Sequence, residues 1–154
     1  MVRYNYRVRK LGIDWGGDMR LELTKKTDLA FQALDVIASS SQERISGPSL
    51  AESLEITTQY LPHVMAPLTK AGWVTSTSGP KGGYVISTDL VDISLLDLIE
   101  AVEGQFDDTR CLHLGPKHGA NHHCALHDPW MKARAALLSE LDESRLSDMI
   151  TLSS

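Results

Sequence analysis

The chain has 154 residues, of which 42% are hydrophobic, and this allows one compact core with an appended segment. No apolar run approaches the roughly 18 residues that cross a bilayer, and the first residues lack the apolar stretch of a signal peptide, so we expect a cytoplasmic protein. A net charge of -5 argues against nucleic-acid binding through bulk charge and leaves local basic patches as the alternative.

The chain begins with a segment that shows no clear hydrophobic period, and Gly16 and Gly17 separate it from the first periodic stretch. We expect residues 1–18 to be a flexible N-terminal extension. From Thr24, apolar residues recur at helical spacing as far as a serine-rich end at 39–41, which predicts a first helix. Its predicted inward face consists of Leu29, Ala30, Ala33, Leu34, Ile37 and Ala38.

Two short helices joined by a tight turn are predicted next. Pro48 suits the first turn of one helix, and a small turn at 55–57 leads to another that ends at Gly72. Pro67 predicts a kink or an early end in this second helix. The predicted inward residues of the pair are Leu50, Ala51 and Leu54, then Leu61, Val64, Met65 and Leu68. This arrangement is typical of a helix-turn-helix.

A β-hairpin comes after the helix-turn-helix. Residues 73–77 and 84–86 flank a turn that contains three glycines and Pro80. The glycine-rich turn lacks the Walker pattern of a phosphate-binding loop and lies between strands, so a wing tip is favoured. The sequence therefore predicts a winged helix.

The last part of the chain predicts two more helices. One covers 92–103 and ends at Gly104, and the other opens with Asp128 as its N-cap. Apolar residues of the latter suit a dimer interface; they are Leu137, Leu138 and Leu141. We expect a mostly α fold with a winged helix-turn-helix domain at 19–90 and dimerisation helices at 91–150, which enclose a Cys/His loop at 105–128.

The Cys/His loop has an unusual composition. Both cysteines and five of the six histidines of the chain lie between Cys111 and His127, a span in which average density predicts about one such residue. In a reducing compartment, two cysteines are more often metal ligands or redox thiols than a structural disulfide. The loop therefore predicts a metal or a cluster.

Five stretches occur in an order that resembles a known family: "MRLELTKKTDLAFQAL", "TTQYLPHVMAPLTKAGWV", "SGPKGGY", "ISLLDLIEAVEG" and "RCLHLGPKHGANHHCALH". The chain resembles the bacterial winged-helix iron-sulfur transcription regulators that include IscR, NsrR and CymR. The resemblance implies a homodimer that represses or activates promoters by binding double-stranded DNA, and not an enzyme. It also implies that DNA affinity changes when a cluster is gained, lost, oxidised or nitrosylated.

The resemblance also implies a set of ligands. Cys111 matches the first and Cys124 the third of three family cysteines, and His118 lies near the position of the missing one. His127 matches the histidine of a C-x-x-H pattern, and Asp28 matches a carboxylate that completes the cluster from the partner subunit in some relatives. Two thiolates with nitrogen or oxygen ligands favour a 2Fe-2S cluster, although 4Fe-4S is an alternative.

Three alternatives stay open from the residues themselves. Two cysteines and two histidines also form a tetrahedral zinc set, in a structural or storage module whose winged helix contacts other proteins. The thiols can instead act without metal in a cluster-free regulator. For Asp28, the alternative is a solvated residue that complements the helix dipole.

Candidate DNA contacts lie at the second helix of the helix-turn-helix and at the wing. The N-terminal residues of that helix approach base edges, and Gln59 suits adenine. The full set is Thr57, Thr58, Gln59, Tyr60, His63, Ser78, Lys81 and Lys25. From Ile45 to Leu90 the only lysines are Lys70 and Lys81, and arginine is absent, whereas relatives often carry an arginine at the position of Ser78. This composition predicts modest phosphate binding.

Overall fold

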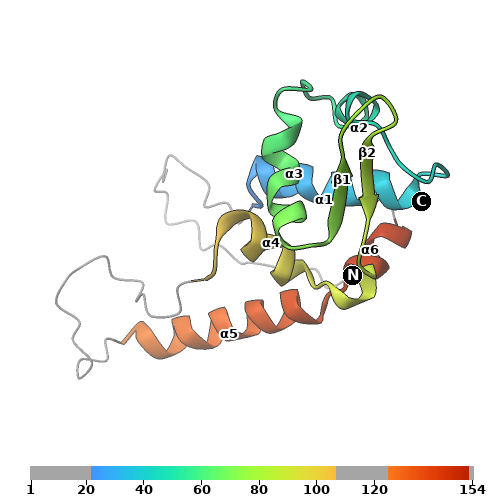
Figure 1. Cartoon of the computed structure of the whole chain (residues 1–154). Coiled ribbons are helices and arrows are strands. Elements are labelled where there is room, and N and C mark those ends of the chain that lie inside the picture. The colour runs from blue at the N-terminus through green and yellow to red at the C-terminus, as the bar shows by residue number, and fades with distance from the viewer. Residues whose placement is uncertain (1–21, 107–124, 153–154) are drawn as a thin grey trace, which may run out of the picture.

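The computed structural model describes residues 22–106 and 125–152 (Figure 1). The predicted N-terminal extension and most of the Cys/His loop lie outside these ranges. The described elements are α1 (Lys25–Ser39), α2 (Gly47–Ser53), α3 (Leu61–Lys70), β1 (Val74–Thr77), β2 (Gly83–Ile86), the short 3-10 helix η1 (Leu90–Asp92), α4 (Leu95–Glu103), α5 (His127–Glu143) and α6 (Leu146–Leu152). None of the described helices is long and apolar enough to span a membrane.

Helix α1 crosses the centre of the winged-helix body (Figure 1). Thr24 caps its start, since the Thr24 side chain accepts a hydrogen bond of 3.3 Å from the backbone N–H of Thr27. The predicted inward residues of α1 are buried except Ala38, which is exposed in the last turn of the helix, beyond the buried stripe. The spacing of apolar residues therefore predicted the buried face of α1 correctly, except that it included Ala38.

Helices α2 and α3 form the predicted helix-turn-helix. All seven inward residues predicted for them are buried. Glu55 adopts φ 53° in the turn between them, a left-handed conformation that reverses the chain in little space. The predicted early end of α3 is wrong, because the helix continues past Pro67 to Lys70. Burial of Leu68 in the core outweighs the single hydrogen bond that Pro67 cannot donate.

Strands β1 and β2 form an antiparallel hairpin in which Val74 pairs with Ile86 and Thr77 with Gly83. At the tip, a side chain on Gly82 would overlap the carbonyl oxygen of Thr77, so the turn requires glycine there. The hairpin is the predicted wing. It packs against α1 and α3, which fixes its position beside the helix-turn-helix.

The two helices α4 and α6 pack against the winged-helix body. Ser94 and Asp97 form a capping box at the start of α4. Leu146 and Ile150 of α6 are buried in the same core as α1, and the backbone N–H of Leu146 donates to the carbonyl of Ile93 over 3.0 Å. The core therefore continues past residue 90. The seven-residue α6 was not predicted, because two inward positions are too few to define a period.

Helix α5 differs from the other long helices, since none of its residues is buried. It extends away from the body alongside α4 (Figure 1). The predicted N-cap at Asp128 is wrong: α5 begins at His127, Leu126 is the capping position without a side-chain hydrogen bond, and Asp128 lies in the first turn. There its charge complements the helix dipole.

Candidate nucleic-acid interface and Cys/His segment

Residues 57–61, just before and at the start of α3, form a single helical turn that Pro62 separates from the rest of the helix. Thr57 accepts hydrogen bonds of 3.2 Å at its hydroxyl from Tyr60 N–H and at its carbonyl from Leu61 N–H. Thr57 is thus the functional cap of this turn, although α3 itself starts at Leu61. Pro62 has no N–H to donate to the carbonyl of Thr58, which separates the turn from the helix.

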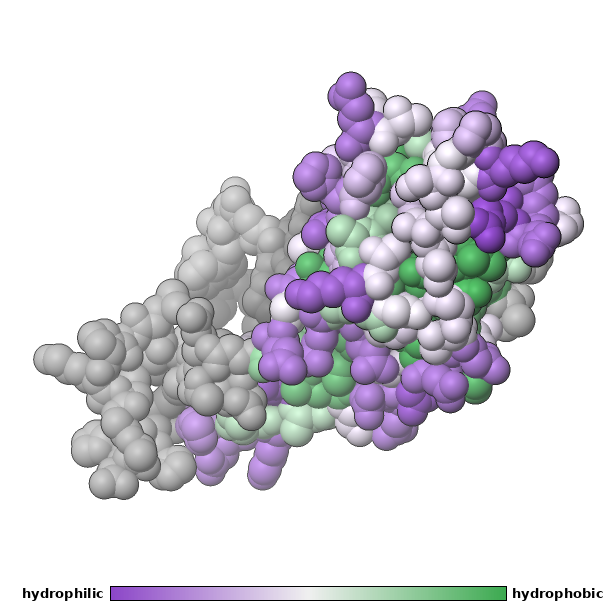
Figure 2. Space-filling model, viewed as in Figure 1, coloured by the Kyte–Doolittle hydropathy of each residue, from purple (hydrophilic) through white to green (hydrophobic). Residues whose placement is uncertain are grey.

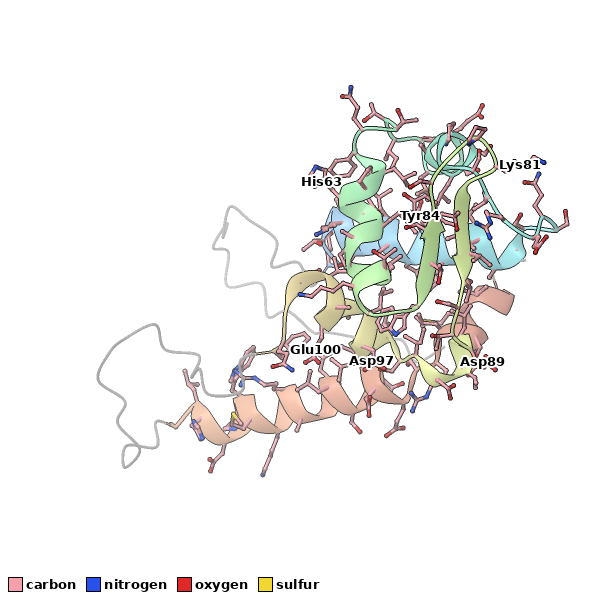
Figure 3. The ribbon with its side chains drawn as sticks, viewed as in Figure 1. His63, Lys81, Tyr84, Asp89, Asp97 and Glu100 are labelled. Atoms are coloured by element: carbon pink, nitrogen blue, oxygen red, sulfur yellow. The ribbon has the colours of Figure 1, made fainter. Side chains whose placement is uncertain are left out.

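The side chains of this turn are free to meet a ligand. The predicted contact residues Thr57, Thr58, Gln59, Tyr60 and His63 are all exposed. The ring centroids of Tyr60 and His63 lie 5.9 Å apart with an interplanar angle of 38°, so the two aromatic side chains are neighbours on this surface. Figure 3 shows His63 on the outer side of α3. An exposed amide, hydroxyls and rings at a helix start are suited to base edges and phosphates.

The wing presents its tip at the same end of the molecule. Ser78 and Lys81 are both exposed, and Figure 3 shows Lys81 at the tip of the hairpin. A hydrogen bond of 2.8 Å from Gly82 N–H to the carbonyl of Gly79 closes the turn. Tyr84 comes next on β2, and its ring packs toward Gly47 at the start of α2. The wing is therefore anchored at its base while its tip faces solvent.

Lys25 and Asp28 lie at the start of α1, away from the wing. Lys25 borders a cleft of about 420 Å³ with residues 53–56, the turn of the helix-turn-helix. The Asp28 carboxylate accepts a hydrogen bond of 3.0 Å from the Gln32 side chain and lies 4.0 Å from the Lys25 ammonium, with 47% of its side chain exposed. Asp28 is thus oriented by Gln32 yet open to a further ligand.

A hydrogen-bonded connection links the start of α1 to the end of α4. The Glu103 carboxylate accepts hydrogen bonds from the buried Thr27 hydroxyl at 2.5 Å and from Thr24 N–H at 3.4 Å. The bond from Thr27 lowers the pKa of Glu103, partial burial raises it, and the bonds from Thr24 lower it again, with a net decrease. Glu103 comes just before residues 105–128, the Cys/His loop or Cys/His segment, so this connection joins the start of that segment to α1.

The predicted metal ligands are only partly within the described residues. Cys111, His118 and Cys124 lie outside them, whereas His127 is the first residue of α5. Residues 22–106 and 125–152 by themselves contain no group of three or more potential metal-ligating side chains. Within one chain, the start of α5 lies away from the start of α1, which carries Asp28 (Figure 1).

Two features of the structure were not predicted from the sequence: the Thr27–Glu103 hydrogen bond and the position of Arg44. Thr27 and Glu103 are 76 positions apart, and nothing local marks their pairing. Arg44 was also missed, because it immediately precedes the stretch in which basic residues were counted. A β-branched residue beside it, Ile45, was the available signal, since it favours an extended conformation that can pair with the hairpin.

Comparison with known proteins identifies the chain's relatives. The sequence profile of the Rrf2 family, described as an iron-dependent transcriptional regulator, matches residues 23–152. The chain belongs to the Rrf2 family. An IscR, the HTH-type transcriptional regulator of Vibrio parahaemolyticus, is 31% identical over 132 residues, which cover 85% of this chain and 78% of that protein. An IscR of Escherichia coli O1:K1 / APEC is 30% identical over 131 residues, which cover 84% and 80%.

Solved structures confirm the winged-helix prediction for this Rrf2 protein. IscR of T. potens superposes with a TM-score of 0.67 at 28% identity, covering 90% of this chain and 92% of that one. CymR of B. subtilis, a global cysteine regulator, superposes with a TM-score of 0.72 at 24% identity, covering 88% and 100%. The Rrf2 chain is therefore a DNA-binding transcriptional regulator rather than an enzyme, as the sequence predicted.

Proposed function

We propose that this Rrf2 regulator is a homodimer that senses redox state, nitric oxide or iron-sulfur supply through an iron-sulfur cluster at its Cys/His segment. The observation that carries the proposal is the gathering of two cysteines and five histidines between Cys111 and His127, the first residue of α5, in a chain whose relatives include IscR. The Rrf2 family is one of iron-dependent transcriptional regulators, which further supports an iron-containing group. A transcription regulator of this kind works in the cytoplasm.

The chemistry of the donor set fits a 2Fe-2S cluster. Cys111 and Cys124 supply two thiolates, the softest donors in the chain, and His118 and His127 supply imidazole nitrogens. Asp28 supplies a half-exposed carboxylate that Gln32 orients. When bound, such a cluster provides a reversible one-electron change whose potential responds to the charge of its ligands. Histidine ligands that exchange protons would make this response depend on pH.

The proposal assigns Asp28 to the cluster of the partner subunit. Asp28 and His127 occupy the starts of two helices that lie apart within one chain, which favours ligation across a dimer (Figure 1). Helix α5 suits the dimer interface, because none of its residues is fully buried within its own chain and it carries apolar residues such as Leu137, which is 37% exposed. Pairing two α5 helices would remove these residues from water.

The connection between Glu103 and α1 offers a route from the cluster to DNA. A change at the Cys/His segment would act on the end of α4, and the Thr27–Glu103 hydrogen bond would pass it to α1. Helix α1 packs against both α2 and α3, which carry the DNA-reading turn. The two cluster states must therefore bind DNA with different affinities, and the logarithm of the ratio of those affinities gives the coupling free energy.

The metal content of protein purified without oxygen tests this function. We expect a brown sample with visible absorption and matched amounts of iron and acid-labile sulfide. Colourless protein with stoichiometric zinc would contradict the proposal and support the zinc-binding alternative. The colour and the metal analysis are independent of DNA binding, so they test the cofactor alone.

A heterodimer experiment tests the contribution of Asp28. Wild-type protomers are paired with protomers that carry both Asp28→Ala and Cys111→Ser, and heterodimers are isolated. Ligation across the dimer leaves two half-damaged sites, whereas ligation within a subunit leaves one normal site. A wild-type spectrum at half occupancy would show that Asp28 does not serve the partner's cluster.

A cluster-free thiol regulator is the second candidate. It is favoured by the likeness to the oxidised form of Staphylococcus aureus CymR, with a TM-score of 0.63 at 25% identity over 84% of this chain and 96% of that one. In this case Cys111 and Cys124 themselves are the redox-sensitive groups. Metal-free protein whose DNA affinity changes on reversible thiol oxidation would favour this candidate over the cluster.

A further inference from the structure

The part of the chain that reads DNA carries few positive charges. From Ile45 to Leu90 the only lysines are Lys70 and Lys81, and arginine is absent. Lys70 lies in the last turn of α3. It is at the opposite end of the helix from residues 57–60, the turn proposed to read DNA. Contacts to phosphates supply a large part of the affinity of a protein for DNA. The interface therefore needs a cation from outside this stretch.

The connection from α1 to α2 brings such a cation to the wing. Ile45 N–H donates to the Tyr84 carbonyl over 3.1 Å, and Tyr84 N–H donates to the Ile45 carbonyl over 2.8 Å. These two bonds make an antiparallel bridge, so the connection extends the wing beyond β2. Because side chains alternate along an extended chain and Ile45 is buried, Arg44 is directed to the outer face.

Arg44 lies against Gly83, the first residue of β2 after the hairpin turn. A side chain added to Gly83 would overlap the carbonyl of Ile45 and lie 2.9 Å from Cγ of Arg44. The aliphatic part of Arg44 thus occupies the space that the glycine leaves empty. Arg44 is half-buried, as expected for a side chain whose stem packs on the protein while its guanidinium reaches water. The wing therefore holds the Arg44 stem in a defined place.

The charge of Arg44 is available for a ligand. No ion pair joins Arg44 to a carboxylate among the residues that the structure describes. Gly83 also lines a notch of about 570 Å³ between α2 and the wing, so Arg44 adjoins it. The lining of the notch contains no carboxylate and is rich in hydroxyl groups, which come from Ser46, Ser76, Thr77, Ser78 and Tyr84.

The connection from α1 to α2 has a strongly hydrophilic surface. Figure 2 shows a group of hydrophilic residues beside the wing, over the connection from α1 to α2. Lys81 lies at the tip of the same wing (Figure 3). The hydroxyl groups line the notch itself, whereas Arg44 lies beside Gly83 at its edge and Lys81 lies at the tip of the same hairpin. This combination suits the oxygen atoms of a phosphodiester backbone.

We propose that Arg44 is a DNA-contacting residue, which binds a backbone phosphate beside the wing and supplies the positive charge that the wing sequence lacks. The inference rests on the DNA binding of this Rrf2 regulator and adds a residue that lies outside both the helix-turn-helix and the hairpin. A guanidinium can grip a phosphate with two parallel hydrogen bonds, which the ammonium of Lys81 cannot do.

The test measures binding to two duplexes of about 30 base pairs, long enough for two half-sites separated by one or two helical turns. One is a random-sequence pool, and the other is selected from that pool by the native protein. Arg44→Met keeps the aliphatic stem against Gly83 and removes the charge. We expect it to weaken binding to both duplexes on the order of tenfold at 0.1 M salt and to lower the salt slope by about one for each phosphate that is no longer bound.

Matched variants separate this contact from bulk charge and from folding. Lys70→Met removes the same charge far from the reading turn and is expected to leave the salt slope near that of the native protein, while Arg44→Lys retains most of the affinity. Thermal unfolding of Arg44→Met should match the native protein. If Arg44→Met does not fold, Arg44→Gln carries the same test.

Three outcomes would overturn the inference. Arg44→Met with native affinity and native salt slope would remove Arg44 from the interface. A loss equal to that of Lys70→Met would reduce its role to bulk charge, and a loss confined to the selected duplex would indicate base reading instead of phosphate binding. Native protein that binds nothing in the random pool, and therefore selects no duplex, would count against DNA binding itself, which distinguishes the two failures.

Discussion

The winged-helix body and helix α5 differ in how each is stabilised. In the body, α1 and α3 bury continuous apolar faces, and residues such as Leu34 and Leu68 are fully buried. Helix α5 has 17 residues and buries none of them. A helix gains most of its stability in a protein from packing an apolar face rather than from intrinsic propensity. The body therefore has an apolar core of its own, whereas α5 would gain stability from the partner subunit and the cluster proposed above.

The largest effect that would sharpen this contrast is expected at the Cys/His segment. Cys124→Ser removes one of two thiolates, so we expect complete loss of the cluster, measured as iron, sulfide and visible absorption. The body does not depend on this segment for its core, so its thermal unfolding should stay cooperative. Undiminished cluster content in Cys124→Ser would show that the thiolates are not ligands.

A pair of leucine substitutions tests the two regions directly. Leu34→Ala leaves a cavity in the core and should cost about 2–5 kcal/mol of unfolding free energy, measured by urea denaturation. The matched change in α5 is Leu137→Ala. It should cost much less unfolding free energy when the protein concentration lies below the dissociation constant of the dimer. It should instead weaken the dimer, measured by sedimentation equilibrium. Equal losses of stability in both variants would break the comparison.

Two substitutions at the reading end of the body separate base reading from phosphate binding. Gln59→Ala should reduce discrimination among duplexes by about 1–3 kcal/mol, because it removes the amide that we propose recognises a base. Lys81→Ala should weaken all duplexes alike and reduce the salt slope. Both are measured by fluorescence anisotropy at several salt concentrations. If neither variant changes binding at any salt concentration, the winged helix contacts DNA in another way.

The smallest effect is expected where the body meets the Cys/His segment. The folded-state pKa of Glu103 lies below its ordinary value, mainly because Thr27 donates a hydrogen bond to the carboxylate. A carboxylate with a lowered pKa stabilises the fold above its unfolded-state pKa, and this contribution disappears as pH falls through the folded-state value.

Glu103→Gln should therefore be less stable than the native protein near neutral pH. The difference should shrink as pH falls below the ordinary pKa of glutamate and vanish below the lowered folded-state pKa of Glu103. Thermal unfolding across this range measures it. Thr27→Ser, which keeps the donating hydroxyl, serves as the control and should retain the pH dependence. A stability difference that persists unchanged into acid would mean that the charge of Glu103 has no role in the connection.

Much of the fold was predictable because its signals are local. The period of apolar residues identified the faces of α1, α2 and α3, and the glycines identified the hairpin tip and the ends of α3 and α4. The errors occurred at helix ends, where a single residue such as Pro67 or Asp128 gives an ambiguous signal and packing decides. The candidate ligands Cys111 and Cys124 were predicted from composition and resemblance, and their arrangement stays a prediction.

The sequence by itself determined the winged-helix class, the family and the residues available for DNA and cluster chemistry, since each is encoded in short stretches whose order suffices. Only the tertiary structure decided which distant residues meet. It placed Arg44 beside the wing through the Ile45–Tyr84 bridge, and it joined Thr27 to Glu103. Such contacts depend on how the core brings separate elements together, and no local pattern of side chains specifies that pairing.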